Sequence, residues 1–240
     1  MQDVFIFNYT VLWKDTFMNE IKTVSLFDLS KSIAGEFLSK YEYPWEALKE
    51  IESIILSIGA NLPSDKYFSP SENVWIANDV SIPHTAVIQA PAIIESGTEI
   101  RNGAFIRGRV IVGEGCVIGN SCEIKNSIIF NNAQVPHFNY IGDSILGYKA
   151  HTGAGAITSN VKSDKTKVCI KLGEHIINTG LKKFGAMIGD YAEIGCNTVL
   201  NPGTIIGRNS NIYPLSSVRG YVPENSIYKS QNNIVKKFSD

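Results

Sequence analysis

The chain has 240 residues, 44% of them hydrophobic and 19% charged, and its formal net charge at pH 7 is −1. This composition is typical of a globular protein of one or two domains and excludes a strongly basic nucleic-acid or membrane surface. The four cysteines include no C-x-x-C pair and do not form a disulfide framework. No apolar run approaches the roughly 18 residues of a membrane span. We therefore expect a reduced, cytoplasmic protein without a secretory leader.

Residues 1–70 differ in pattern from the rest of the chain and have helical features. Pro44 stands at a favourable first helical position, and the apolar residues after it have helical spacing: Trp45, Leu48, Ile51, Ile54 and Ile55. Residues 30–40 indicate a further helix. The segment is too short for a nucleotide-binding domain and lacks G-x-G-x-x-G, so we expect a small, partly helical N-terminal segment.

Residues 71–221 are dominated by a repeat of six residues. Aliphatic residues recur at every sixth position in two runs: Ile76, Ile82, Ile88, Ile94, Ile100, Ile106, Val112, Ile118 and Ile124, then Ile188, Ile194, Leu200, Ile206, Ile212 and Val218. This period fits neither a helix nor a simple alternating strand, but it fits a short strand followed by a tight corner. Three such units close one triangular coil, and stacked coils share one core. The repeat therefore predicts a parallel β-helix, and a β-sandwich with strands about every 8–12 residues fits less well.

Two stretches interrupt this repeat, one at about residues 130–140 and one at about residues 161–186. Because an interruption has to leave the stack, we expect both to be loops, and loops on rigid scaffolds often carry function. The second is long enough to form a lid or an arm. Residues 222–240, rich in Lys and Asn, are expected to form a C-terminal tail.

One part of the repeat carries a more specific pattern. Val135 to Asn160 reads VPHFNYIGDSILGYKAHTGAGAITSN, which contains H-x-x-Y-I-G-D followed by G-A-G-A-I-T-S-N. This stretch resembles the acetyltransferase half of the bifunctional enzymes that make UDP-N-acetylglucosamine, which are left-handed β-helix acyltransferases. The resemblance extends without gaps from about Arg107 to Asn160 and resumes from Lys183 to about Ser226. It implies an all-β, left-handed parallel β-helix, acetyl-CoA as co-substrate, a homotrimer, and an amino-sugar 1-phosphate as acceptor.

The resemblance also implies roles for individual residues. His137 matches the general base, Asn160 and Lys183 match residues of the catalytic loop, Arg107, Lys125 and Tyr140 match groups that hold the sugar phosphate, and Ala154 and Cys196 match positions beside acetyl-CoA. A histidine suits proton removal near neutral pH, and Arg and Lys suit a phosphate. Three departures leave the acceptor sugar open. His151 stands where the family has an Asn that contacts the sugar, Val161 replaces an aromatic residue next to Asn160, and the loop from Val161 to Lys182 is longer.

Other interpretations of these residues stay open. Each polar side chain could be an ordinary loop or surface residue, whereas Cys116 and Cys122, at the small interior position, are expected to be core. A β-helical metalloenzyme would need a close H-x₄-H pair, which the histidines at 84, 137, 151 and 175 do not supply, so we expect no metal requirement. The chain could also be a sugar-nucleotide-binding module whose catalysis has lapsed. It lacks a Gly-rich phosphate loop with a Lys-containing motif, so we expect no nucleotidyltransferase activity, and no nucleic-acid or membrane partner.

Overall fold

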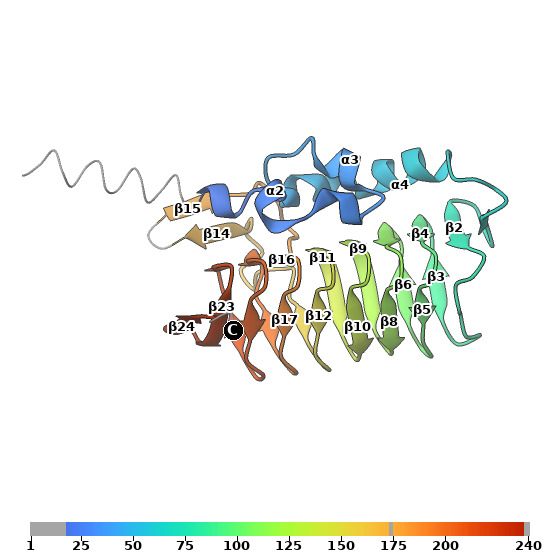
Figure 1. The fold of residues 1–240 in the computed structure, drawn as a ribbon. Helices are drawn as coiled ribbons and strands as arrows, with labels where there is room; N and C mark the ends of the chain where they lie inside the picture. The colour runs from blue at the N-terminus through green and yellow to red at the C-terminus, as the bar shows by residue number, and fades with distance from the viewer. Residues whose placement is uncertain (1–17, 173–174, 238–240) are drawn as a thin grey trace, which may run out of the picture.

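The structure is a computed structural model that describes residues 18–172 and 175–237. It is a stack of triangular coils with short helices along one side (Figure 1). The predicted fold class, an all-β left-handed parallel β-helix of six-residue repeats, is confirmed. The outermost parts of the predicted N-terminal segment and C-terminal tail, residues 1–17 and 238–240, lie outside the described residues.

Each coil contributes one short strand to each of three faces. The first face contains β2 (Val74–Ala77), β4 (Ala92–Ile94), β7 (Val110–Val112), the second halves of β9 (Glu123–Ile129) and β11 (Tyr140–Leu146), β16 (Ala186–Ile188), β19 (Thr204–Ile206) and β22 (Tyr221–Val222). The second face contains β5 (Glu99–Ile100), β8 (Val117–Asn120), β10 (Gln134–His137), β12 (His151–Thr152), β17 (Glu193–Ile194), β20 (Asn211–Ile212) and β23 (Ser226–Ser230). The third face contains β3 (Val87–Gln89), β6 (Phe105–Arg107), the first halves of β9 and β11, β13 (Ile157–Thr158), β18 (Val199–Leu200) and β21 (Ser217–Val218).

The interior of the stack is built from the aliphatic residues of the repeat. Ile76 pairs with Ile94 of the next coil, and Ile94 pairs with Val112, so aliphatic side chains stack on one another. Cys116 and Cys122 fill interior positions as predicted and are 0% and 1% exposed. Burial raises the pKa of the Cys116 thiol to about 12, so it stays protonated and is no nucleophile.

The prediction that residues 130–140 form a loop outside the stack is wrong. This stretch stays in the stack, because β10 pairs with β8 on one side and with β12 on the other. His137, which we expected on that loop, is instead the last residue of β10. The repeat changes register here because interior residues are five apart, not six, at two corners: Ile124 to Ile129 and Ile141 to Leu146.

Asn126 and Asp143 occupy these two short corners. Their φ angles are 46° and 50°, in the left-handed region, which Asn and Asp adopt more readily than most residues. The corners lie on successive coils, because Lys125 pairs with Gly142 and Ser127 pairs with Ser144. The shortened repeat therefore places two polar side chains next to one another at the edge between the third and first faces.

The second interruption does leave the stack. It contains an antiparallel hairpin of β14 (Cys169–Leu172) and β15 (His175–Asn178). Val168 and Ile170, with Leu181 and Phe184 further along, are buried in the same apolar cluster as the N-terminal helices. The insertion is thus an arm packed against the outside of the first face.

The N-terminal segment covers the first face, as the helices along the stack show (Figure 1). It contains α2 (Thr23–Leu26), η1 (Leu29–Lys31), α3 (Gly35–Leu38), η2 (Pro44–Lys49) and α4 (Ile51–Gly59). Pro44 begins a helix as predicted. The further helix predicted within residues 30–40 is shorter than that range, because α3 covers only Gly35–Leu38 and η1 is separate from it. Ile51, Ile54 and Ile55 are buried in one cluster with Ile93 and Ile111, which face outward from β4 and β7. The chain itself therefore covers one of its three faces.

Both ends of the stack carry an antiparallel strand. β1 (Tyr67–Phe68) pairs with β2, and β24 (Asn233–Lys236) folds back on β23. β23 itself continues the second face by pairing with β20, so most of the predicted tail is part of the stack. The domain boundaries at residues 70 and 221 stay a prediction. None of the described helices is long and apolar enough to cross a membrane.

Candidate functional site

Three of the predicted site residues meet where the third face ends. Lys125 Nζ lies 3.3 Å from Asp143 Oδ2, and Asn160 Nδ2 donates to the Tyr140 hydroxyl oxygen at 3.2 Å. Asn160 Nδ2 also donates to Asp143 Oδ2. We call Lys125, Tyr140, Asp143 and Asn160 the third-face network. Side chains up to 35 residues apart in sequence are brought together because they lie on three successive coils.

Asp143 is the centre of the network, and we assigned it no role from the sequence. It is 4% exposed, and its second oxygen, Oδ1, accepts a hydrogen bond of 2.8 Å from Asn126 Nδ2. Its place in the G-D pair of the motif, together with the five-residue step from Ile141 to Leu146, is the signal that could have identified it. A buried carboxylate needs such donors and a nearby cation to remain charged.

A second ion pair lies beside the network on the third face. The Arg107 guanidinium donates to the Glu123 carboxylate, and both side chains are partly exposed. Arg107 and Lys125, the two cations expected to hold a phosphate, therefore each face a carboxylate. A phosphate bound here would share or replace these carboxylate contacts.

The Tyr140 hydroxyl remains protonated at neutral pH. Burial and the nearby Asp143 carboxylate raise the pKa of Tyr140 above its ordinary value near 10, and the hydrogen bond from Asn160 opposes this only in part. The hydroxyl therefore accepts from Asn160 and keeps its own proton for a further hydrogen bond.

Lys183 lies where the insertion rejoins the stack. The N–H of the next residue, Phe184, donates to the Asn160 carbonyl at 3.0 Å, and the Gly185 N–H donates to the Asp143 carbonyl at 2.8 Å. The insertion thus leaves and re-enters beside the third-face network, and Lys183 is exposed next to it. The backbone after Lys183 is therefore held beside Asn160, and the catalytic role of both residues stays a prediction.

His137, Ala154 and Cys196 stack at a different corner, between the second and third faces. The Gly155 N–H donates to the His137 carbonyl at 3.0 Å, and the Asn197 N–H donates to the Ala154 carbonyl at 2.8 Å. His137 and Cys196 are exposed. Three successive coils therefore place the predicted base and the two predicted acetyl-CoA positions along one edge.

His151 stands apart from the other predicted substrate residues. It begins β12 on the second face, and its Nδ1 lies 2.8 Å from Glu193 Oε2 of the next coil. The pair lines a hollow of about 540 Å³ together with Gln134 and Lys149. Within one chain, His151 is not brought to the third-face network.

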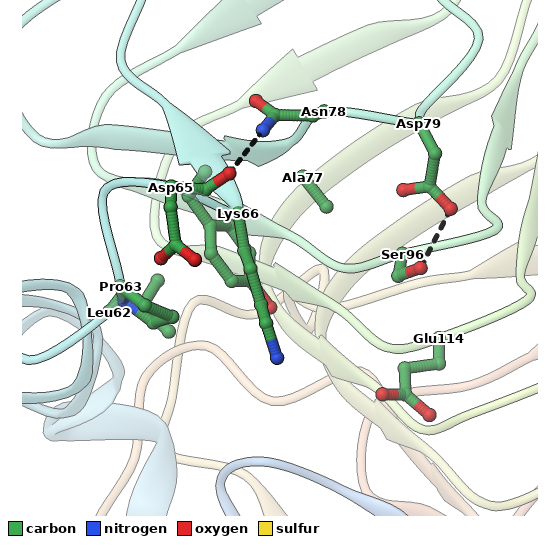
Figure 2. A pocket seen from close by; sticks show the side chains of 10 residues that line it. Leu62, Pro63, Asp65, Lys66, Ala77, Asn78, Asp79, Ser96 and Glu114 are labelled. Carbon is green, nitrogen blue, oxygen red and sulfur yellow. Dashed lines mark hydrogen bonds between the residues drawn. The ribbon is translucent and has the colours of Figure 1, made fainter.

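Another hollow, of about 550 Å³, lies between β1 and the first coils. Figure 2 shows Asp65, Lys66 and Glu114 around it, with Asp79 accepting a hydrogen bond of 2.7 Å from Ser96. It contains none of the predicted site residues. Within residues 18–172 and 175–237, no group of three or more His, Cys, Asp or Glu side chains is placed to hold a metal ion.

The chain matches known proteins over its central coils. Residues 88–181 match the family model of the GMPPB C-terminal domain. A bifunctional protein GlmU from Methanococcus aeolicus is 36% identical over 110 residues, which is 45% of this chain and 26% of that protein. A bifunctional sugar-1-phosphate nucleotidylyltransferase/acetyltransferase from Sulfurisphaera tokodaii is 33% identical over 102 residues, 42% of this chain and 25% of that protein. The predicted resemblance is confirmed.

This resemblance covers only part of each relative, because the chain spans about a quarter of the length of these proteins. Among solved structures, a putative acetyltransferase from Bacillus cereus aligns with 68% of this chain and 77% of its own, at 16% identity and a TM-score of 0.39. The match to the family model begins in β3, on the third face, and ends within the insertion. It therefore includes the whole third-face network.

Proposed function

We propose that this chain transfers an acetyl group from acetyl-CoA to the amine of an amino-sugar 1-phosphate. The observation that carries the proposal is the third-face network: Lys125, Tyr140 and Asn160, which the resemblance assigns to substrate and catalysis, meet in one hydrogen-bonded cluster. The similarity to a sugar-1-phosphate nucleotidylyltransferase/acetyltransferase supports the reaction class. Such a product would serve sugar-nucleotide and cell-envelope precursor synthesis in the cytoplasm.

In the proposed reaction the acceptor amine attacks the thioester carbonyl, and the C–S bond breaks to release CoA. His137 removes the proton from the attacking nitrogen, and the departing thiolate takes up a proton. Ala154 and Cys196 lie beside the acetyl-CoA thioester, while Asn160 and Lys183 border the reacting atoms. Arg107, Lys125 and Tyr140 hold the sugar phosphate, and His151 contacts the sugar. The reaction as written needs neither a metal nor a covalent enzyme intermediate.

We also propose a homotrimer with sites between neighbouring subunits. Within one chain, His151 lies on the second face and the third-face network on the next face. An acceptor held between two subunits could touch both groups, because one subunit's second face can oppose its neighbour's third face. The first face is not available for this contact, since the chain's own helices cover it.

The test is turnover by the purified chain with acetyl-CoA and a panel of amino-sugar phosphates that includes glucosamine 1-phosphate. CoA release with one acceptor, and a product heavier by one acetyl group, is expected. Products should be identified by mass spectrometry, because a thiol reagent would also react with the exposed Cys196. The N-acetylated sugar phosphate, which has no free amine, is the matched control. Binding without release of CoA for every acceptor would favour the alternative, a sugar-nucleotide-binding module without catalysis.

A further inference from the structure

We propose that Asp143 is a positioning residue that fixes which hydrogen-bonding atoms the site presents to the acceptor. This inference rests on the proposed function. It adds to it a positioning residue and the donor or acceptor character of two atoms that face the acceptor sugar. Asp143 does not have to touch substrate for this role. It acts through Asn160, Tyr140 and Lys125.

The first step is the orientation of the Asn160 amide. An ionised carboxylate can only accept hydrogen bonds, so the side-chain atom of Asn160 that faces Asp143 has to be the nitrogen. The same Nδ2 atom lies 3.2 Å from the Tyr140 hydroxyl oxygen, so its two hydrogens are used by Asp143 and Tyr140. The Asn160 Oδ1 atom is then turned away from both, and no donor in the described part of the chain reaches it.

The contact with Asn160 also sets the direction of the Tyr140 hydroxyl hydrogen. Because its oxygen accepts from Asn160, its hydroxyl hydrogen is free to point elsewhere. The network therefore presents one acceptor, Asn160 Oδ1, beside one donor, the Tyr140 O–H. An amine N–H or sugar hydroxyl hydrogen fits the first, and a sugar or phosphate oxygen fits the second.

The third step is the charge of Lys125. Its ammonium lies 3.3 Å from Asp143 and its side chain is 19% exposed, so the carboxylate holds it at the edge of the site. Asn126 completes the arrangement by donating to Asp143 at 2.8 Å and to the Leu48 carbonyl at 3.2 Å. The buried carboxylate thus ties three successive coils and the N-terminal segment to one orientation of the site.

Asp143→Asn tests the proposal, because it keeps the shape and removes the charge. The amide can face Asn160 in either orientation, so we expect the acceptor Michaelis constant to rise about tenfold while that of acetyl-CoA changes less than about twofold. In an Asn160→Ala background, Asp143→Asn should raise the acceptor Michaelis constant by less than about threefold, because Asp143 can no longer act through Asn160. Equal losses in both backgrounds, or an unchanged acceptor constant, would overturn the proposal.

Asp190→Asn is the matched control. Asp190 is also a buried aspartate, 1% exposed, but it accepts from backbone amides at the opposite end of the first face. It should lower thermal stability without changing the acceptor constant. If Asp143→Asn does not fold, Tyr140→Phe and Asn160→Ala replace it, and each should raise the acceptor Michaelis constant. An unchanged constant in both variants would contradict the assigned donor and acceptor atoms.

Calorimetry with glucosamine 1-phosphate separates this inference from the proposed function. If the wild type binds this probe but transfers no acetyl group to any acceptor, the proposed reaction is wrong. Asp143→Asn should still weaken binding of the probe about tenfold in that case, and unchanged binding would overturn the positioning role. If the wild type neither binds nor turns over, both proposals fail.

Discussion

Asp190 Oδ2 accepts a hydrogen bond of 2.7 Å from the backbone N–H of Asp28, 162 residues away in sequence. Its other oxygen accepts from the Tyr148 N–H at 2.8 Å, and the Asp190 N–H donates to the Leu26 carbonyl at 3.1 Å. One buried side chain therefore joins the N-terminal segment to two coils. The apolar contacts of the first face depend on this segment remaining in place.

Asp190→Asn should destabilise the protein by about 2 kcal/mol, because one of the two amides then loses its acceptor inside the protein. Urea unfolding should show a lower midpoint, with an unchanged slope of the unfolding free energy against urea concentration. Asp164→Asn, on the exposed part of the insertion, is the control and should leave the midpoint unchanged. Equal stability of Asp190→Asn and the wild type would show that the N-terminal segment does not depend on this contact.

Glu95 should make stability fall as pH rises. It is 5% exposed, its Oε2 has no hydrogen-bond partner among the described residues, and burial, with the nearby Glu114, raises its pKa from 4.5 to about 7. Between these two values the folded state binds more protons than the unfolded chain, so the free energy of unfolding decreases as pH increases. The full effect is on the order of 3 kcal/mol.

Glu95→Gln tests this dependence, because glutamine cannot ionise. Urea unfolding at pH 4.5, 6 and 8 should show that the free energy of unfolding of the variant increases relative to that of the wild type as pH rises. Asp79→Asn at the same corner is a useful comparison, since hydrogen bonds from the Ser96 hydroxyl and the Gly97 N–H lower rather than raise the pKa of Asp79. Parallel pH curves for wild type and Glu95→Gln would mean that Glu95 ionises freely.

The sequence predicted the repeat and the identity of the interior residues because a period of six has few other structural solutions. It did not predict that residues 130–140 stay in the coils. A one-residue shortening at Asn126 and at Asp143 looks like an interruption when interior positions are counted in sixes, although the stack tolerates it. The hydrogen bonds that these short corners make were therefore hidden as well.

The candidate site was predictable only where a motif named its residues. Lys125, Tyr140 and Asn160 do meet, but the contacts that their partner Asp143 makes join successive coils, and the motif does not specify those contacts. The pairing of His151 with Glu193 likewise joins residues 42 apart in sequence. Long-range contacts of this kind follow from the number of residues in each coil and in the insertion.

Phe138 and Leu215 should lie in the interface of the proposed trimer. They are 63% and 81% exposed, and their φ angles of 53° and 58° are unfavourable for bulky side chains. Gly155 and Asn197 occupy the equivalent corner positions between them. Phe138→Asn and Leu215→Asn should therefore weaken the trimer by sedimentation equilibrium while leaving the folded monomer as stable or more stable.

Tyr191→Asn provides the control for this prediction. Tyr191 is 49% exposed with a φ of 58°, but it lies at the corner between the first and second faces. Its replacement should not change the assembly. A wild-type protein that sediments as a monomer at working concentration would contradict both the trimer and a site shared between subunits.

His137→Ala should lower acetyl transfer without unfolding the protein. His137 is exposed at the end of β10, and changes at such positions usually alter stability by no more than about 0.5 kcal/mol. Loss of a general base typically lowers turnover by about 10²–10⁴-fold, and the Michaelis constant of acetyl-CoA should change little. Arg107→Ala should instead raise mainly the acceptor Michaelis constant, because a phosphate contact is present in the ground and transition states alike.

His84→Ala is the matched control for His137→Ala. Residues 84, 102, 120 and 137 occupy the same corner position on successive coils, so both histidines stand at equivalent exposed places on the stack. Of these four positions, only residue 137 lies directly next to Ala154 on the following coil. We expect steady-state kinetics with the best acceptor to be normal for His84→Ala and severely reduced for His137→Ala. Near wild-type turnover of His137→Ala would mean that the chain keeps the coil scaffold of its relatives but uses another proton acceptor, and His151, held by Glu193, would then be the next residue to replace.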